Sequence, residues 1–190
     1  MKNTNAFTLI ELMIVIAIVG IIAIIAVPNM RAMISNSKSI SVSNQLMIDI
    51  MYTRSVAIRH QANAQMVPID LINGTGTLAG GGGVNWAAGW VIISTANPGV
   101  TLRQQENMGP DPQIRSVAFF TTDAGVNIPT GTLDSANPIE FNAEGIAERG
   151  GALEIGVLGC AGDYARRLHI NQIGQVISTD ILCPAGFAAR

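Results

Sequence analysis

An apolar segment near the start of the chain, Phe7 to Pro28, limits what the chain can fold into. An α-helix needs about 20 apolar residues to cross the hydrocarbon core of a bilayer, and this segment is long enough. Because lipid offers the backbone no hydrogen-bond partners, a single segment of this kind has to be helical. We therefore predict a membrane-spanning helix over residues 7–28.

Three other kinds of apolar segment fit less well. A cleaved secretory signal has an apolar region of only about 7–15 residues and a small-residue cleavage site behind it, whereas Pro28 and Asn29 follow this longer one. A buried core helix is seldom uniformly apolar over such a length. An ordinary membrane anchor would not be expected to keep Glu11 within its apolar residues.

Glu11 is the informative residue of this segment. A carboxylate in hydrocarbon costs about 3 kcal/mol or more, so it is expected to have a function and a partner. It either reaches the headgroup boundary, four residues from Phe7, or pairs with a cation. If the chain were cut after Ala6, the new amine of Phe7, on the same or a neighbouring chain, would supply that cation.

The start of the chain, MKNTNA followed by FTLIEL, resembles the leader and stem of type IV pilins and type II secretion pseudopilins. The resemblance implies that residues 1–6 are a leader, that a prepilin peptidase cuts between Ala6 and Phe7, and that the amine of Phe7 is methylated. It also implies that Glu11, fifth in the mature chain, guides assembly, and that Pro28 bends the helix. The family nearly always has Gly in place of Ala6, and we expect slower cleavage from this departure.

Composition suits one globular domain carried behind a stem. The chain has 190 residues, of which 13% are charged, and its net charge is -2. This low content of charged residues is typical of a protein that packs into an assembly, or of a weakly soluble domain. The slightly negative net charge produces no basic field that would attract nucleic acid. Lys2 is the only charge of the leader, so the positive-inside tendency predicts a cytoplasmic amino end. A single stem that crosses the inner membrane in this direction would place the domain in the periplasm, and the pilin resemblance implies a later place in a pilus at the cell surface.

The chain has two cysteines, Cys160 and Cys183. In an oxidising periplasm they most simply form one disulfide, and two free, buried thiols are the alternative. The spacing of cysteines and histidines suggests no metal, and we expect no cofactor.

Residues 29–62 should continue the helix in amphipathic form and pack one face on a sheet. Apolar residues recur there at roughly helical spacing, namely Met30, Met33, Ile34, Leu46, Ile50 and Ala57. The opposite side carries Ser35, Asn36, Lys38, Ser41, Asn44, Asp49 and Arg59. The serine-rich middle, Ser35 to Ser43, is weakly helical and predicts fraying or a break.

Residues 63–190 are predicted to form a β-rich domain. Strands are expected at 65–72, 86–94, 100–105, 114–121, 138–142, 152–158, 164–170 and 175–178, the last two forming a hairpin around Ile173 and Gly174. A loop is expected at 73–85, and its Gly80 to Gly83 run is not a phosphate loop because no GK[ST] follows. Trp86 and Trp90 should lie on the same face of one strand and pack in the core.

Later segments resemble GspH/FimT-type minor pilins (FimT/FimU-like). Met51 to Asn63 is similar to the end of their long helix, although Val56 replaces the usual acid. The W-x-x-G-W spacing of Trp86 to Trp90 and the C-terminal hairpin are similar as well. The resemblance implies an α+β pilin fold, in which a long N-terminal helix packs on an antiparallel β-sheet and a C-terminal disulfide closes the domain.

The same resemblance implies a minor pilin of a bacterial type IV pilus, in the priming complex at the filament tip, with roles in motility and adhesion. Its partners would be other minor pilins, the major pilin, the inner-membrane assembly platform and prepilin peptidase. The alternative is a type II secretion pseudopilin near the pseudopilus tip, against which a C-terminal disulfide weighs slightly.

A DNA-binding pilin for natural transformation is a further alternative. Arg166, Arg167 and Arg190, with His169, would form a basic patch that neutralises phosphates. Some GspH/FimT-type pilins bind DNA through C-terminal arginines, but this tail lacks their G-R-x-R-like motif. Arg166 and Arg167 also alternate faces of a strand, so an exposed solubilising face is favoured.

Catalysis has no recognisable motif in the chain, and we expect no enzyme. A catalytic site needs a nucleophile with a base, or paired carboxylates, in one concave site. The scattered carboxylates of Glu140, Glu144, Glu148 and Glu154 are expected to be solvated surface charges.

Replacing Glu11 by Ala tests the proposed role of this carboxylate. The Glu11→Ala chain should still be processed, because the cleavage site is intact, but it should fail to assemble, because the partner of the Phe7 amine is lost. Immunoblotting for processing and electron microscopy for filaments measure both. Normal filaments in this variant would refute the pairing.

Overall fold

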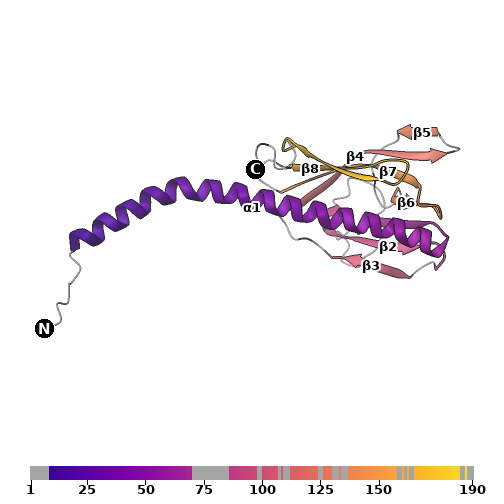
Figure 1. The fold of residues 1–190 in the computed structure, drawn as a ribbon, viewed down its shortest axis with the longest axis horizontal. Helices are drawn as coiled ribbons and strands as arrows, with labels where there is room; N and C mark the ends of the chain where they lie inside the picture. The colour runs from indigo at the N-terminus through magenta and orange to yellow at the C-terminus, as the bar shows by residue number, and fades with distance from the viewer. Residues whose placement is uncertain are drawn as a thin grey trace. The chain divides into compact units, whose positions relative to one another are not determined.

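The structure is a computed structural model that describes residues 9–69, 86–97, 100–106, 108, 112–123, 126–129, 133, 137–157, 160, 162, 165–184 and 187. The chain divides into two units, Met1–Ile34 and Ser35–Arg190. The elements in order are α1 (Leu9–His60), β1 (Ala64–Pro68), the 3-10 helix η1 (Trp86–Ala88), β2 (Trp90–Ser94), β3 (Thr101–Gln105), β4 (Pro112–Asp123), β5 (Val126–Pro129), β6 (Ile139–Phe141), β7 (Ala147–Val157), β8 (Ala165–Ile170) and β9 (Val176–Ile181) (Figure 1). The predicted α+β fold class is confirmed.

The helix α1 is continuous over 52 residues. The predicted fraying between Ser35 and Ser43 is wrong, because Ser39 and Ser43 are buried and this packing outweighs their low helix propensity. The helix includes Pro28, and the bend there stays a prediction. Within the part of the chain that the structure describes, no helix meets the length and hydropathy expected of a membrane span.

The face that α1 packs on the domain differs from the predicted one. Leu46, Ile50 and Ala57 are buried as expected, whereas Met33 is 72% exposed and Ile34 is 53% exposed. Asp49, expected on the polar side, is fully buried. The buried residues recur every three or four positions and are Ser39, Val42, Ser43, Leu46, Asp49, Ile50, Thr53, Val56 and Ala57. Small and polar side chains make up much of this face, so a search for large apolar residues misses it.

The strands described in the structure form one antiparallel sheet in the order β3-β2-β1-β6-β7-β4-β5, with β8 paired to β7 and β9 paired to β8. The central strand is β7. One of its edges pairs with β4, and the other pairs first with β6 and then with β8. Within the second unit, the end of α1 lies along the sheet (Figure 1), and its buried side chains share one core with those of the sheet.

Most predicted strands lie close to where they were expected. The C-terminal hairpin is confirmed, with Ile170 opposite Val176 and Ala165 opposite Ile181. The strand β5 is missing from the prediction, which placed no strand between 121 and 138. The loop expected at 73–85 lies outside the described residues.

The predicted strand over 86–94 is wrong in its first half. Trp86 lies in η1, and β2 begins only at Trp90. Gly89 between them has a φ of 116°, a conformation that glycine adopts without strain, and this breaks the strand. Both indoles are fully buried, so the predicted core packing is confirmed, and Trp86 Nε1 donates to the carbonyl of Leu133 at 3.1 Å.

Asp49 joins α1 to the sheet. Its Oδ2 accepts hydrogen bonds from Trp90 Nε1 at 2.9 Å and from Gln45 Nε2 at 3.2 Å. Its Oδ1 lies 3.0 Å from Arg103 Nε on β3, and the Arg103 guanidinium also lies over the ring of Tyr52, 5.4 Å from the centroid. Burial of the carboxylate is tolerated because these donors replace water.

Removing the Asp49 carboxylate should destabilise the domain. Asp49→Ala leaves the buried indole N–H of Trp90 without its acceptor and the Arg103 guanidinium without its ion-pair partner, so we expect the free energy of unfolding to fall by about 2–4 kcal/mol. Urea unfolding of the full chain in detergent, followed by tryptophan fluorescence, measures this, because the only two tryptophans are both in the core.

Glu144→Ala is the matched control, since the Glu144 side chain is exposed. Its free energy of unfolding should stay within about 0.5 kcal/mol of the parent. Equal losses in the two variants would contradict the role given to Asp49.

Candidate functional site

The first unit presents a continuous apolar helix surface. Its large apolar side chains are each at least half exposed: Leu9, Ile10, Leu12, Met13, Ile14, Val15, Ile16, Ile18, Val19, Ile21, Ile22 and Ile24. Contiguous exposed apolar surface of this kind marks a site of contact with protein or lipid. Glu11 lies in the first turn of α1, at one end of this surface, and is exposed.

Two residues predicted to act with Glu11, namely Ala6 and Phe7, lie outside the described residues. Cleavage between them, methylation of Phe7 and the pairing of its amine with Glu11 therefore stay predictions.

The arginines of β8 do not come together in one patch. Arg166 and Arg167 lie on opposite faces of the strand, as predicted. Arg166 Nη1 forms an ion pair with Asp180 Oδ1 on β9 at 2.6 Å, and Arg167 Nη2 pairs with Glu154 Oε1 on β7 at 2.5 Å. Arg190 lies outside the described residues.

Glu154 lies between two arginines on neighbouring strands. Arg115 on β4 and Arg167 on β8 are both its register partners across β7. Arg115 donates to Glu154 Oε2 from Nε at 2.9 Å and from Nη2 at 2.7 Å. The glutamate side chain is only 4% exposed, against 46% and 44% for the arginines. The prediction of a solvated Glu154 is therefore wrong.

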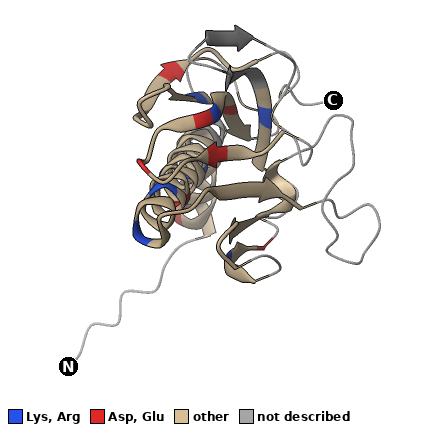
Figure 2. Ribbon diagram, turned by 90° about the vertical axis from the view of Figure 1, so that its right-hand side faces the viewer, with Lys and Arg blue, Asp and Glu red and all other residues tan. Residues whose placement is uncertain are grey.

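The two arginines keep the buried Glu154 ionised. Burial alone would raise the pKa of Glu154, but hydrogen bonds from Arg167 and Arg115, together with their charges, outweigh it and hold the pKa below the ordinary value of 4.5. The carboxylate in turn neutralises positive charge on this face. Figure 2 shows basic and acidic positions interspersed over the ribbon.

Glu140 is a second buried carboxylate that was predicted to be solvated. Its side chain is 8% exposed. Asn63 Nδ2 and Gln65 Nε2 each donate to Glu140 Oε1 at 3.1 Å, and Arg149 Nη1 lies 3.0 Å from Oε2. Glu140 and Glu154 were both missed because their partners come from other segments of the chain: Asn63 and Gln65, for example, reach Glu140 from the start of β1. The only signal in the sequence is an acid within a short apolar strand, PIEFN.

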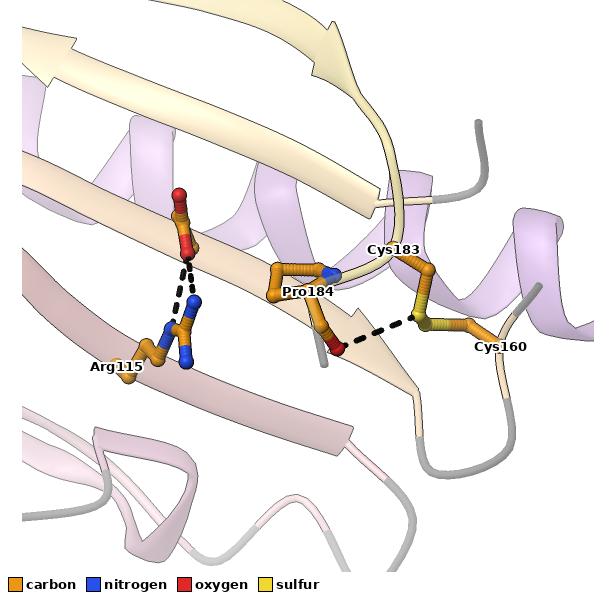
Figure 3. The surroundings of a disulfide bond; sticks show 5 residues. Arg115, Cys160, Cys183 and Pro184 are labelled. Atoms are coloured by element: carbon orange, nitrogen blue, oxygen red, sulfur yellow. Dashed lines mark hydrogen bonds and ion pairs between the residues drawn. A yellow bond between two sulfur atoms is a disulfide. The ribbon is translucent and has the colours of Figure 1, made fainter. Parts of the chain in front are cut away.

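The disulfide expected from the sequence is present. Figure 3 shows the bond between Cys160 and Cys183 beside Pro184. The two cysteines are 23 residues apart, so the bond joins the segment after β7 to the segment after β9. The amide of Cys183 also donates to the carbonyl of Gly162 at 2.7 Å.

Phe187 fixes the C-terminal segment beyond the disulfide. Its ring is 4% exposed and lies on β7, where a Cβ at Gly156 would be only 2.6 Å from Phe187 Cδ2. The Arg115 guanidinium lies 5.2 Å from the ring centroid, so a cation–π contact links the tail to β4. The amide of Phe187 donates to the carbonyl of Pro184 at 2.8 Å.

An exposed apolar stem followed by an antiparallel sheet and a C-terminal disulfide defines a pilin-type protein. Residues 1–27 match the prokaryotic N-terminal methylation motif, and residues 42–174 match the family described as type II transport protein GspH. Because the second match covers more than half of the chain, the chain belongs to the type II transport protein GspH family.

Two crystal structures of the type IV minor pilin FimU from Pseudomonas aeruginosa PAO1 are similar to this chain. The first, in space group P65, is 17% identical over 73% of this chain and 90% of that chain, with a TM-score of 0.46. The second, in space group P21, is 15% identical over 81% of this chain and 94% of that chain, with a TM-score of 0.45. No curated protein matches this chain.

The Glu154 ion pairs predict loss of stability in acid. Because the folded-state pKa lies below that of the unfolded chain, the stabilisation is complete above pH 4.5 and is lost as the pH falls through the folded-state pKa. The urea midpoint of the full chain in detergent should therefore fall between pH 7 and about pH 3. Glu154→Gln, less stable at neutral pH, should show a smaller fall.

The control for this experiment is Glu144→Gln, whose exposed side chain should leave the fall of the midpoint as in the parent. A fall in Glu154→Gln as large as in the parent would show that Glu154 does not carry the acid dependence.

Proposed function

We propose that this protein is a minor pilin of a bacterial type IV pilus and acts in the priming complex at the filament tip. One observation carries the proposal: an N-terminal methylation motif at residues 1–27 stands directly before a GspH domain at 42–174. A stem with this motif suits insertion into a filament, and the domain suits display on its surface.

In this proposal the stem has two environments. Prepilin peptidase removes residues 1–6 by cutting between Ala6 and Phe7, and it methylates the Phe7 amine. The helix over 7–28 first anchors the chain in the inner membrane, with the domain in the periplasm, and then packs in the filament core. Support comes from the exposed apolar side chains of the stem and from the position of Glu11 in the first turn, where it is proposed to pair with the Phe7 amine of a neighbour.

The partners in this proposal are other minor pilins, the major pilin, the inner-membrane assembly platform and prepilin peptidase. The role is structural, and the buried carboxylates support it. Asp49, Glu140 and Glu154 each form an ion pair with an arginine and accept a hydrogen bond from a further donor.

A second candidate is a pseudopilin of a type II secretion system. The description of the matched family, type II transport protein GspH, favours it. The C-terminal disulfide, more typical of the pilus branch, favours the minor pilin. DNA binding is not proposed, because the carboxylates of Asp180 and Glu154 pair with Arg166 and Arg167.

Deletion of the gene separates these functions. A minor pilin that primes assembly predicts loss of surface pili by electron microscopy, restored by the parent gene, with secretion of exported enzymes unchanged. Normal pili together with defective secretion would favour the pseudopilin, and normal pili with normal secretion would reject both.

A further inference from the structure

We propose that the free edge of β9, Val176–Ile181, accepts an extended segment from another subunit of the priming complex. This inference rests on the proposed function and names the surface through which the domain meets a partner. Three features of the second unit support it: the direction of the β9 amides, the apolar side chains around them, and a hollow beside the strand.

The hairpin geometry decides which amides of β9 are available. Asn171 N donates to the carbonyl of Gln175 at 3.0 Å, which makes this the first hydrogen-bonded pair of the hairpin. Hydrogen-bonded and non-hydrogen-bonded pairs alternate in an antiparallel ladder. The register of β8 and β9 then turns the N–H and C=O groups of Val176, Ser178 and Asp180 away from β8. Among the described strands, none pairs with β9 on that side.

The edge of β9 has little of the protection that is usual for an edge strand, because its one charged residue, Asp180, is paired with Arg166 on β8. Proteins protect edges with charged side chains, proline or bulges. The ladder between β8 and β9 continues without a bulge, and β9 contains no lysine or proline. The edge strand β3 differs, because its residues are mostly polar and its pairing with β2 has a bulge between Ile92 and Ile93.

Apolar side chains surround the β9 edge. Ile177 is 48% exposed, and the flanking Ile173 and Leu182 are 60% and 73% exposed. On α1, Met51 lines the same hollow as Val176 and Ile177 and is 57% exposed. A partner strand would cover part of this surface, which gives its docking a hydrophobic driving force besides the backbone hydrogen bonds.

A hollow between α1 and β9 would receive side chains of the partner. Its volume is about 410 Å³, and it is lined by Met51, Arg54, Gly174, Gln175, Val176 and Ile177. Alternate side chains of a strand point to the same face, so every second residue of an added strand would face this hollow. We therefore expect apolar residues at alternate positions of the partner segment.

Arg54, which lines the hollow, predicts the charge of one residue of the partner segment. Its Nε donates to the carbonyl of Gly145 at 2.9 Å, and in the described residues no carboxylate forms an ion pair with it. A guanidinium in a hollow that is otherwise largely apolar complements a carboxylate. The occupant is thus an extended, mainly apolar segment with an acidic residue near Arg54.

The variant Ser178→Pro tests the edge directly. Proline removes the amide that points to the free edge but no hydrogen bond to β8, a position where edge strands tolerate proline. We expect a chain that is processed and retains its urea midpoint but gives at least about tenfold fewer pili than the parent. Ser178→Thr keeps the amide and should give normal pili.

The hollow is tested by Met51→Lys and its control Met51→Leu. The lysine should reduce pilus number because it places a charge where apolar side chains dock, and the leucine should not. If deletion of the gene abolishes pili but Ser178→Pro and Met51→Lys both restore them, the edge inference is overturned while the minor-pilin function stands. If deletion leaves pili normal, the proposed function itself fails.

Hydrogen exchange tests whether a partner strand covers the edge of β9, even if Ser178→Pro does not fold. In the full chain in detergent, the amides of Val176, Ser178 and Asp180 should exchange fast, and in the purified priming complex they should exchange at least about tenfold more slowly. The amides of Ile177 and Thr179, bonded to β8, should be slow in both. Fast exchange at the three edge amides in the complex would overturn the proposal. Protection that arises in the chain alone at high concentration would also overturn it, because the partner would be a second copy.

Discussion

The buried carboxylate of Asp49 is the contact on which the arrangement of helix and sheet depends. It lies on the packed face of α1 and is bonded to Trp90 on β2 and paired with Arg103 on β3. Hydrophobic contacts are not directional, so the packing of Leu46 and Ile50 alone would allow α1 to slide or rotate on the sheet. A hydrogen bond to the indole of Trp90 allows one position only. The polar group therefore sets the register of the helix, and the apolar core supplies most of the stabilisation.

The sequence predicts the features of this fold that depend on local pattern. The apolar stem over 7–28, the C-terminal hairpin and the disulfide of Cys160 and Cys183 follow from composition, spacing and family resemblance, and the hairpin and disulfide are confirmed. The strand predicted from Trp86 shows the limit of such pattern, because the positive φ of Gly89 turns the chain where the spacing of the two tryptophans suggested a continuous strand.

Buried charge could not be predicted, because it depends on partners far away in the chain. Glu154 is buried between Arg115 and Arg167, which reach it only through the pairing of β7 with β4 and β8. Without knowledge of this strand pairing, a glutamate in a strand is predicted to be solvated. An arginine on a hairpin is likewise predicted to be available to a ligand. The contacts of Glu154 correct both expectations for the candidate site. The carboxylate of Glu154 is buried, and both Arg115 and Arg167 are paired with it.

Phe187 makes the end of the chain part of the folded core. Its ring occupies the space left by the missing side chain of Gly156, and Cys183, held to Cys160, sets the distance from which the segment reaches that place. The number of residues from Cys183 to Phe187 and the small size of the residue at position 156 therefore depend on each other. An insertion between the cysteine and the phenylalanine, or any larger residue on β7 at this point, would require a change in the other.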